Sequence, residues 1–208
     1  MKRKTVILGG GTFQPIRNHL SLSAPAFGTT ATILKGILPD SELVLTKMAN
    51  PASKLLSNED VEQYLDALIE DENVGTIVLN VAFCDYKALP IDGIESDFHG
   101  ERLRTENGNI TITLTPTEKI IAKIRKKRPD IFLVGFKTTT NKTSDEQFKI
   151  ALKMMKSTKC NLVLANDTVT RNNFVLTAEE TIYGESTNRM TSLLELAEII
   201  SLRSNLTY

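Results

Sequence analysis

The sequence predicts a Rossmann-like α/β fold, a doubly wound, mainly parallel sheet with an inserted β-hairpin flap. Short apolar runs rich in Val, Ile and Leu recur along the chain, which is typical of parallel strands buried on both faces. Amphipathic segments separate these runs, as helices do in a doubly wound sheet. The flap is predicted by an Asn107-Gly108 turn between two stretches of alternating polarity.

Five segments are predicted as strands of the main sheet. Each is short and dominated by β-branched residues and leucine, which favour strands. The predicted strands are Thr5–Leu8, Glu42–Leu45, Thr76–Asn80, Ile131–Val134 and Asn161–Ala165.

Five helices are predicted around these strands. The clearest follows Ser57, which together with Asp60 has the spacing of a capping box. Apolar residues then recur at helical spacing and form one stripe, made by Val61, Tyr64, Leu65 and Leu68. The other predicted helices are Thr29–Ile37, Thr117–Lys127, Ser144–Ser157 and Thr187–Leu202.

The flap at about residues 101–115 interrupts this alternation. A hairpin has no place in a parallel sheet, so we expect it to cover a site or to reach a partner chain. An isolated two-stranded hairpin is marginally stable in water, so its apolar side chains must pack on another surface; these are Leu103, Ile110, Ile112 and Leu114. No repeat or linker divides the chain, and residues 1–208 are predicted to form a single domain.

Composition excludes several classes of protein. The chain has 208 residues, 41% hydrophobic and 24% charged, with zero formal net charge, which argues against a nucleic-acid surface or a polybasic membrane patch. We expect no membrane segment and no signal peptide. The two cysteines, Cys84 and Cys160, are far apart in the sequence and form no CxxC motif. Neither a disulfide framework nor a metal site is therefore expected, and the cytoplasm is the expected location.

Small and polar residues follow four of the predicted strands. They are Gly9-Gly10-Gly11-Thr12, Asp85, Gly135-Phe136-Lys137 and Ala165-Asn166-Asp167. Because ligands of open α/β sheets bind beyond the carboxyl ends of the strands, this pattern predicts a ligand site there. The glycines suit close approach of an anion, although a tight turn explains them equally well. Asp85 suits a ribose or base contact, or alternatively a turn or helix cap.

The same motifs, taken in chain order, resemble the phosphopantothenoylcysteine synthetase (phosphopantothenate–cysteine ligase) family. The resemblance covers most of the chain, and no single motif carries it alone. The matching stretches are GGGTFQPI at residues 9–16, NVAFCDY at 80–86, RLR at 102–104, VGFKTTT at 134–140 and LAND at 164–167.

The resemblance implies a reaction in two steps. The carboxylate of phosphopantothenate attacks the α-phosphate of CTP or ATP, and the amine of L-cysteine then opens the acyl nucleotidylate. Magnesium is expected with the triphosphate, held mainly by phosphate oxygens and water, and no flavin is expected because no flavin-dependent decarboxylase domain precedes the motifs. The implied nucleotide-binding residues are Gly10, Gly11, Thr12, Asn80, Val81, Ala82, Asp85, Phe136, Ala165 and Asn166.

The chain departs from the family pattern at the positions implied to be catalytic. Ser21 replaces an asparagine that steadies the acyl nucleotidylate, and Asn18 can supply that amide if the loop is rearranged. Arg102 replaces a flap lysine, which keeps the charge but changes its shape. Lys153 and Lys156 lie near two expected lysines, or alternatively form a solvated basic face. Cys84 is expected to be a packing residue, not a nucleophile.

Two functions therefore remain open at this stage. One is a divergent, active ligase; the other is a nucleotide-binding or regulatory paralogue without ligase activity. The sequence does not distinguish CTP from ATP. Because the flap lies at a homodimer interface in the family, the resemblance also implies a homodimer in which Arg102 is delivered toward the nucleotide.

Overall fold

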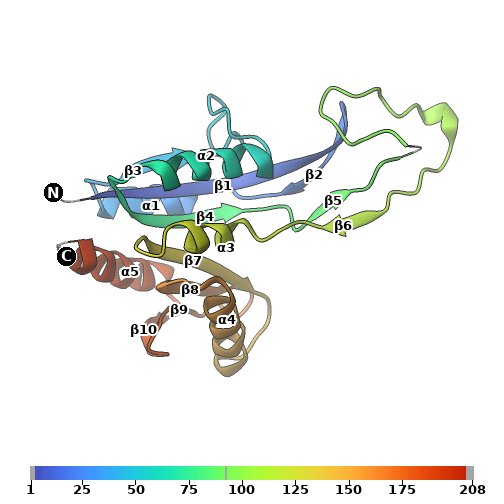
Figure 1. Cartoon of the computed structure of the whole chain (residues 1–208). Coiled ribbons are helices and arrows are strands. Elements are labelled where there is room, and N and C mark those ends of the chain that lie inside the picture. Colours follow the sequence, from blue (N-terminus) through green and yellow to red (C-terminus); the bar gives the residue numbers. More distant parts are fainter. Residues whose placement is uncertain (1–2, 92, 205–208) are drawn as a thin grey trace.

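A computed structural model describes residues 3–91 and 93–204, and its centre is an eight-stranded mixed sheet with helices on both faces (Figure 1). The fold class predicted from the sequence is confirmed. The strands of this sheet are β1 (Lys4–Arg17), β2 (Leu20–Ala24), β3 (Glu42–Leu45), β4 (Val74–Ala82), β7 (Phe132–Thr139), β8 (Leu162–Asp167), β9 (Asn173–Thr177) and β10 (Ile182–Ser186). The helices are α1 (Thr29–Ile37), α2 (Asn58–Glu70), α3 (Ile120–Lys127), α4 (Ser144–Thr158) and α5 (Arg189–Ser204).

The parallel part of the sheet has the order β3-β1-β4-β7-β8. The chain passes from β1 to β3 on one side and then to β4 on the other, so the topological switch point lies between β1 and β4. All five predicted strands are present. Three antiparallel strands were not predicted: β2 pairs with the second half of β1, and β9 and β10 extend the sheet beyond β8.

The glycine run lies inside a strand, which corrects the expectation of a loop after Leu8. Strand β1 continues to Arg17, and Gly10 and Gly11 pair with Val81 and Ala82 of β4. A Cβ atom on Gly10, where φ is 112°, would lie 2.1 Å from Thr46 Oγ1, and one on Gly11 would lie 2.1 Å from the Ala24 carbonyl oxygen. These glycines therefore allow neighbouring segments to pack closely against β1.

Two hydrophobic layers hold the helices on the sheet. Helices α2, α3 and α4 bury side chains such as Leu65, Ile124 and Met155 against one face. Helices α1 and α5 bury Leu34 and Leu196 against the other. All five predicted helices are present. The predicted capping box of α2 is also confirmed, because the Ser57 side chain accepts from the Asp60 N–H and the Asp60 carboxylate accepts from the Ser57 N–H.

An inserted flap is present, but its strands differ from those predicted. Strands β5 (Tyr86–Ala88) and β6 (Leu114–Pro116) pair antiparallel and project from the body beside the β1–β2 hairpin (Figure 1). The Asn107-Gly108 step does not form the predicted hairpin turn, because residues 105–107 form a short 3₁₀ turn. The predicted strands around it, within residues 101–113, are absent. We call residues 86–116 the arm.

The arm is anchored at its base by a small core and one arginine. Ile16, Ala88 and Ile91 are buried there, and Leu103 and Ile112 pack against them. The buried guanidinium of Arg17 donates to four backbone carbonyls, three of them in the arm; the acceptors are those of Ile16, Ile91, Ile94 and Glu95. Two of the four apolar side chains expected to be covered, Ile110 and Leu114, are exposed instead.

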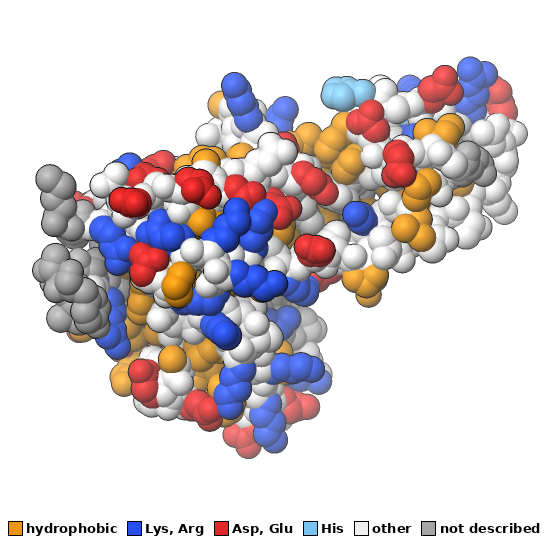
Figure 2. Space-filling model, in the orientation of Figure 1, with side chains coloured by type: hydrophobic (Ala, Val, Ile, Leu, Met, Phe, Trp, Pro, Cys, Tyr) orange, Lys and Arg blue, Asp and Glu red, His pale blue; other side chains and the backbone are white. Residues whose placement is uncertain are grey.

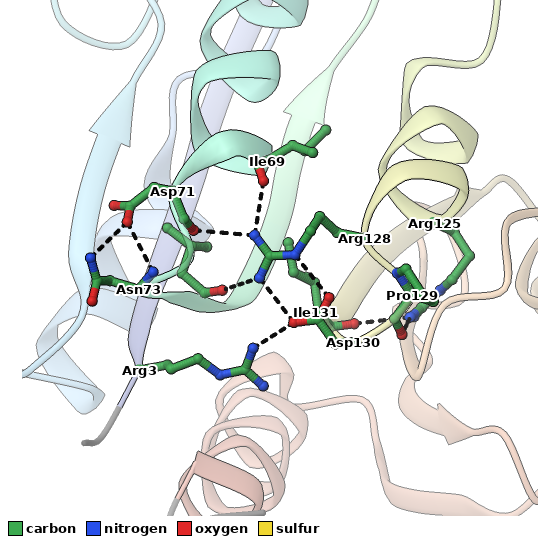
Figure 3. A network of polar contacts seen from close by, with 10 residues as sticks. Arg3, Ile69, Asp71, Asn73, Arg125, Arg128, Pro129, Asp130 and Ile131 are labelled. Atoms are coloured by element: carbon green, nitrogen blue, oxygen red, sulfur yellow. Dashed lines mark hydrogen bonds and ion pairs between the residues drawn. The ribbon is translucent and has the colours of Figure 1, made fainter.

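Arginines close the opposite edge of the sheet, where the parallel strands begin (Figure 3). Arg128 donates to the carbonyls of Ile69, Asp71 and Val74 and forms a two-pronged ion pair with Asp130. Arg3 also binds Asp130. These contacts tie the ends of α2 and α3 to the starts of the strands.

Candidate functional site

The candidate site is an open cleft of about 820 Å³ at the carboxyl edge of the sheet. It reaches from the loop before α1 and the start of α5, on one face of the sheet, to α3 and α4 on the other. Five segments and two single residues line it: 25–30, 79–83, 117–121, 136–138, α4 between Ile150 and Thr158, and the single residues Asp85 and Arg189.

The cleft exists because the sheet divides between β4 and β7. These strands pair from Thr76 with Phe132 to Val78 with Val134, and the pairing then stops although both strands continue. Beyond that point β4 follows β1 as far as Ala82, and β7 follows β8 as far as Thr139. The two diverging strand ends form the floor of the cleft, beside the topological switch point.

Cations outnumber carboxylates in the lining of the cleft. The charged lining residues are Lys119, Lys137, Lys153 and Arg189 against Asp85 and Glu118. Lys119 forms an ion pair with Asp85 at 2.6 Å, and both side chains are exposed. An exposed pair of this kind contributes only ~0–1 kcal/mol, so a ligand can displace it at little cost. The cleft is therefore suited to an anionic ligand that also offers polar groups to Asp85.

Arg189, the first residue of α5, is half-buried at the wall of the cleft. Its Nη2 donates to Thr30 Oγ1 at 2.8 Å, while its Nε is enclosed and has no acceptor. Burial, followed by the positive charge of Arg171, lowers the pKa of the Arg189 guanidinium below its ordinary value. Both causes mean that the surroundings disfavour the cation and would favour a nearby anion.

Six of the predicted nucleotide-binding residues meet in this cleft. They are Asn80, Val81 and Ala82 at the end of β4, Asp85 after it, Phe136 on β7 and Lys153 on α4. The backbone beside Asp85 is held in place because its carbonyl accepts from the Thr117 N–H at 2.9 Å. Of the four strand ends expected to lie together, those of β4 and β7 line the cleft.

The other predicted nucleotide-binding residues do not line the cleft. Gly10 and Gly11 are enclosed by packed segments. The buried hydroxyl of Thr12 donates to Asn58 Oδ1 at 2.6 Å and accepts from the Cys84 N–H at 3.1 Å, so it joins β1 to α2 and to the segment after β4. In this chain the first glycine motif shapes the sheet behind the site.

The end of β8 also lies behind the cleft. Ala165 is fully buried in the core, and Asn166 accepts from the Thr138 hydroxyl at 3.1 Å. Thr138 lines the cleft and Asn166 does not, so Asn166 influences the cleft only through its hydrogen bond with the Thr138 side chain. Lys156 lies outside the lining and pairs with Glu180 at 2.7 Å.

The residues implied to be catalytic are exposed and lie outside the cleft lining. Asn18 is in the turn between β1 and β2, Ser21 is on β2, and Arg102 is on the arm. None of them is brought to the divided edge between β4 and β7 by this chain alone. Cys84 is buried, and burial raises the pKa of its thiol, which agrees with its expected role as a packing residue.

Sequence reasoning missed Arg189, Lys119 and Thr30, whereas Lys137 belongs to one of the predicted strand-end groups and lines the cleft. Lys119 was hidden within a predicted helix that in fact begins at Ile120. Arg189 was not recognised because the β9–β10 hairpin was not predicted, although this hairpin directs α5 to start at the carboxyl edge. The available signal was the apolar run Phe174-Val175-Leu176, separated by a short polar segment from Ile182-Tyr183.

Comparisons with known proteins assign the chain to a family. Residues 38–197 match the family described as the DNA/pantothenate metabolism flavoprotein C-terminal domain. The chain belongs to this family. A curated relative, the coenzyme A biosynthesis bifunctional protein CoaBC of Thermococcus kodakarensis, is 25% identical over 175 residues, which are 79% of this chain. The chain spans only 41% of that relative's length.

Several solved structures share the fold. The DNA/pantothenate metabolism flavoprotein of Streptococcus pneumoniae superposes with a TM-score of 0.75 at 18% identity, over 97% of both chains. The C-terminal domain of a CoaBC protein has a TM-score of 0.68 at 17% identity, over 97% of this chain and 94% of the other. A Cab2 variant in complex with phosphopantothenate–cysteine has a TM-score of 0.67 at 12% identity, over 98% and 87%.

Within residues 3–91 and 93–204, no group of three His, Cys, Asp or Glu side chains is placed to hold a metal ion. The same part of the chain has no helix that is both long and apolar enough to cross a membrane.

Proposed function

We propose that the protein is a phosphopantothenate–cysteine ligase of coenzyme A biosynthesis, driven by CTP or ATP. The observation that carries this proposal is the open, net cationic cleft between β4 and β7, in a chain of the DNA/pantothenate metabolism flavoprotein C-terminal domain family. Support comes from a relative named for coenzyme A biosynthesis and from the fold shared with a protein in complex with phosphopantothenate–cysteine.

The proposed reaction needs positioning and charge neutralisation more than covalent help from the protein. A carboxylate oxygen of phosphopantothenate attacks the α-phosphorus, and pyrophosphate leaves with the electron pair of the broken P–O bond. The cysteine nitrogen then attacks the acyl carbon, loses a proton, and the nucleoside monophosphate leaves. Lys119, Lys137 and Lys153 supply positive charge, and Asp85 accepts from the nucleoside after exchanging its Lys119 partner.

Magnesium would be held mainly by the triphosphate. With Asp85 bound to the nucleoside, Glu118 is the other carboxylate of the cleft lining, and one such group suits an ion that keeps most of its ligands as phosphate oxygens and water. When bound, magnesium would neutralise charge on the leaving pyrophosphate.

A second candidate function is nucleotide binding without ligation. The observation that favours it is that Asn18, Ser21 and Arg102 lie outside the cleft lining while six predicted nucleotide-binding residues lie within it. A protein of this kind would bind CTP or ATP and form no acyl nucleotidylate.

We also propose a homodimer in which the arm of one copy supplies Arg102 to the nucleotide of the other. Support comes from the arm itself, which carries exposed hydrophobic side chains far from the main core (Figure 2). These are Tyr86, Leu89, Ile94, Ile110 and Leu114. A second copy can cover them, and the free edge of β2 can pair across a two-fold axis. Sedimentation giving a monomer of about 23 kDa at micromolar concentration would contradict the dimer.

Product analysis tests the proposed function. The protein is incubated with phosphopantothenate, L-cysteine, magnesium and either CTP or ATP, and phosphopantothenoylcysteine and pyrophosphate are measured. Formation of both products with one nucleotide supports the ligase. Nucleotide binding measured by calorimetry, without either product, supports the second candidate.

A further inference from the structure

The α1–α5 end of the cleft contains a guanidinium without an anionic partner. Among residues 3–91 and 93–204, no carboxylate lies within ion-pair distance of Arg189. Among the same residues, the hydrogen-bond acceptor of Arg189 is the neutral hydroxyl of Thr30. Arg171 adds a second positive charge nearby. A half-buried cation in such surroundings destabilises the empty protein unless a ligand compensates it.

The backbone beside Arg189 adds to the positive potential. Gly28, Thr29 and Thr30 line the same end of the cleft and form the start of α1. Gly28 has φ of 70°, no side chain caps this helix, and no acidic residue lies in its first turn. A Cβ on Gly28 would lie 2.9 Å from Ala49 Cβ and from Leu45 Cδ2, so no capping side chain fits there. The partial positive charge of the helix start therefore lies next to Arg189.

The two ends of the cleft differ in kind. Lys119 at the far end already has a carboxylate partner, Asp85, and both of these side chains are exposed. Arg189 has no carboxylate partner. Because its Nε is enclosed, the terminal nitrogens of its guanidinium are the donors that a phosphate in the cleft can contact. The floor formed by Asn80–Ala82 and by Phe136–Thr138 lies between these ends.

We propose that Arg189 binds a phosphate group and makes the α1–α5 end of the cleft a phosphate subsite, distinct from the Asp85–Lys119 end. Such a phosphate can come from the nucleoside triphosphate or from the phosphorylated acid. This inference rests on the proposed function only for the identity of the ligand. Binding of a phosphate at Arg189 requires no catalysis.

Calorimetric titration of R189Q tests the proposal. CTP and ATP with magnesium are compared with cytidine and adenosine, and phosphopantothenate is compared with pantothenate. We expect R189Q to lose about tenfold or more in affinity for the triphosphates or for phosphopantothenate, as loss of a charge-assisted contact predicts. Affinity for the matching compound without phosphate should change less than about twofold. The pair that responds identifies the source of the phosphate.

A charge-matched control lies on the same helix. Arg203 is exposed in the last turn of α5, about 21 Å along the axis from Arg189, and R203Q should bind every ligand as the unmodified protein does. Should R189Q not fold, R189K serves instead, because it keeps the charge but not the fork, and we expect it to bind the phosphorylated ligand several-fold more weakly.

Two results would overturn the proposal. One is unchanged affinity for every phosphorylated ligand in R189Q, or in R189K where R189Q does not fold. The other is an equal loss for the phosphorylated and unphosphorylated member of each pair. Failure of the proposed ligase function is distinguishable from failure of the phosphate subsite. It appears as absence of product in the unmodified protein, whatever ligands R189Q binds.

Discussion

Arg128 and Arg189 are both half-buried, at opposite edges of the same sheet, and their surroundings differ. At the amino edge, Arg128 donates to three carbonyls and to both oxygens of Asp130 (Figure 3). At the carboxyl edge, Arg189 has one neutral acceptor and an enclosed Nε without any. A guanidinium whose donors all have acceptors in the protein stabilises the fold. A guanidinium with donors left over, beside a cleft, is available to a ligand.

The rest of each edge follows the same contrast. Arg125 at the amino edge donates to the carbonyls of Lys159, Pro129 and Ile131 and to the Asn161 side chain. At the carboxyl edge, Lys137 and Lys153 line the cleft, and none of the carboxylates in the described ranges pairs with either. The difference separates residues that stabilise the fold from residues that are available to a ligand. Four experiments test it.

The largest effect is expected from removing Arg128. The change Arg128→Ala leaves the carbonyls of Ile69, Asp71 and Val74 without this donor and separates Asp130 from its principal partner. We expect a loss of about 2–4 kcal/mol in the free energy of unfolding, measured with urea. Arg3→Ala, which removes an exposed partner of the same carboxylate, should cost less than about 1 kcal/mol. Equal effects of the two changes would contradict the structural role given to Arg128.

The change Asp85→Asn should weaken nucleotide binding by about 1–3 kcal/mol, since it removes a charged acceptor at the cleft. Calorimetry with CTP and with ATP measures it. The control is Asp66→Asn, which removes another lysine-paired carboxylate, on α2 outside the cleft lining. Unchanged affinity in the Asp85 variant would return Asp85 to the role of a turn residue.

The change Arg189→Met should leave stability within about 1 kcal/mol of the unmodified protein or raise it, in contrast to Arg128→Ala. The physical reason is that methionine removes an enclosed, unpaired donor and a buried charge while filling much of the same space. Urea unfolding without ligand measures it. A loss above about 2 kcal/mol would show that Arg189 holds α5 in place, as Arg128 holds α3.

The smallest effect concerns pH at the amino edge. Hydrogen bonds from Arg128 and then Arg3 outweigh burial and hold the pKa of Asp130 well below its usual range. A depressed pKa contributes stability above the unfolded value of about 4, and that stability is lost as pH falls below it. Because Asp130 is 44% exposed, solvent screening limits the contribution to less than about 1 kcal/mol.

The difference in unfolding free energy between the unmodified protein and Asp130→Asn should therefore be constant from about pH 7 to about pH 5 and shrink below about pH 4. Urea midpoints across that range measure it. A difference that grows on acidification would show that the Asp130 carboxylate does not stabilise the folded state in the way its lowered pKa implies.

Several features followed from the sequence alone because their causes are local. The capping box of Ser57 and Asp60 and the apolar stripe after it depend on neighbours within one or two helical turns. Strand β3 and helix α1 have the predicted bounds, Glu42–Leu45 and Thr29–Ile37. The alternation of such elements is sufficient to predict a doubly wound sheet. From that sheet we expected Asp85 and Gly135-Phe136-Lys137 to lie at one edge, and Asp85, Phe136 and Lys137 line the cleft.

Other features were decided only by tertiary structure. Whether Gly9–Gly11 form a loop or a strand depends on β4, α1 and the segments around Thr46 and Ala24, all distant in sequence. The same holds for the arm, where Tyr86–Ala88 pairs with Leu114–Pro116 and not with a nearer segment. Arg189 reaches the cleft only because β9 and β10 turn α5 back to the carboxyl edge. A motif shows which side chains are available, while long-range pairing of strands determines which of them face a ligand.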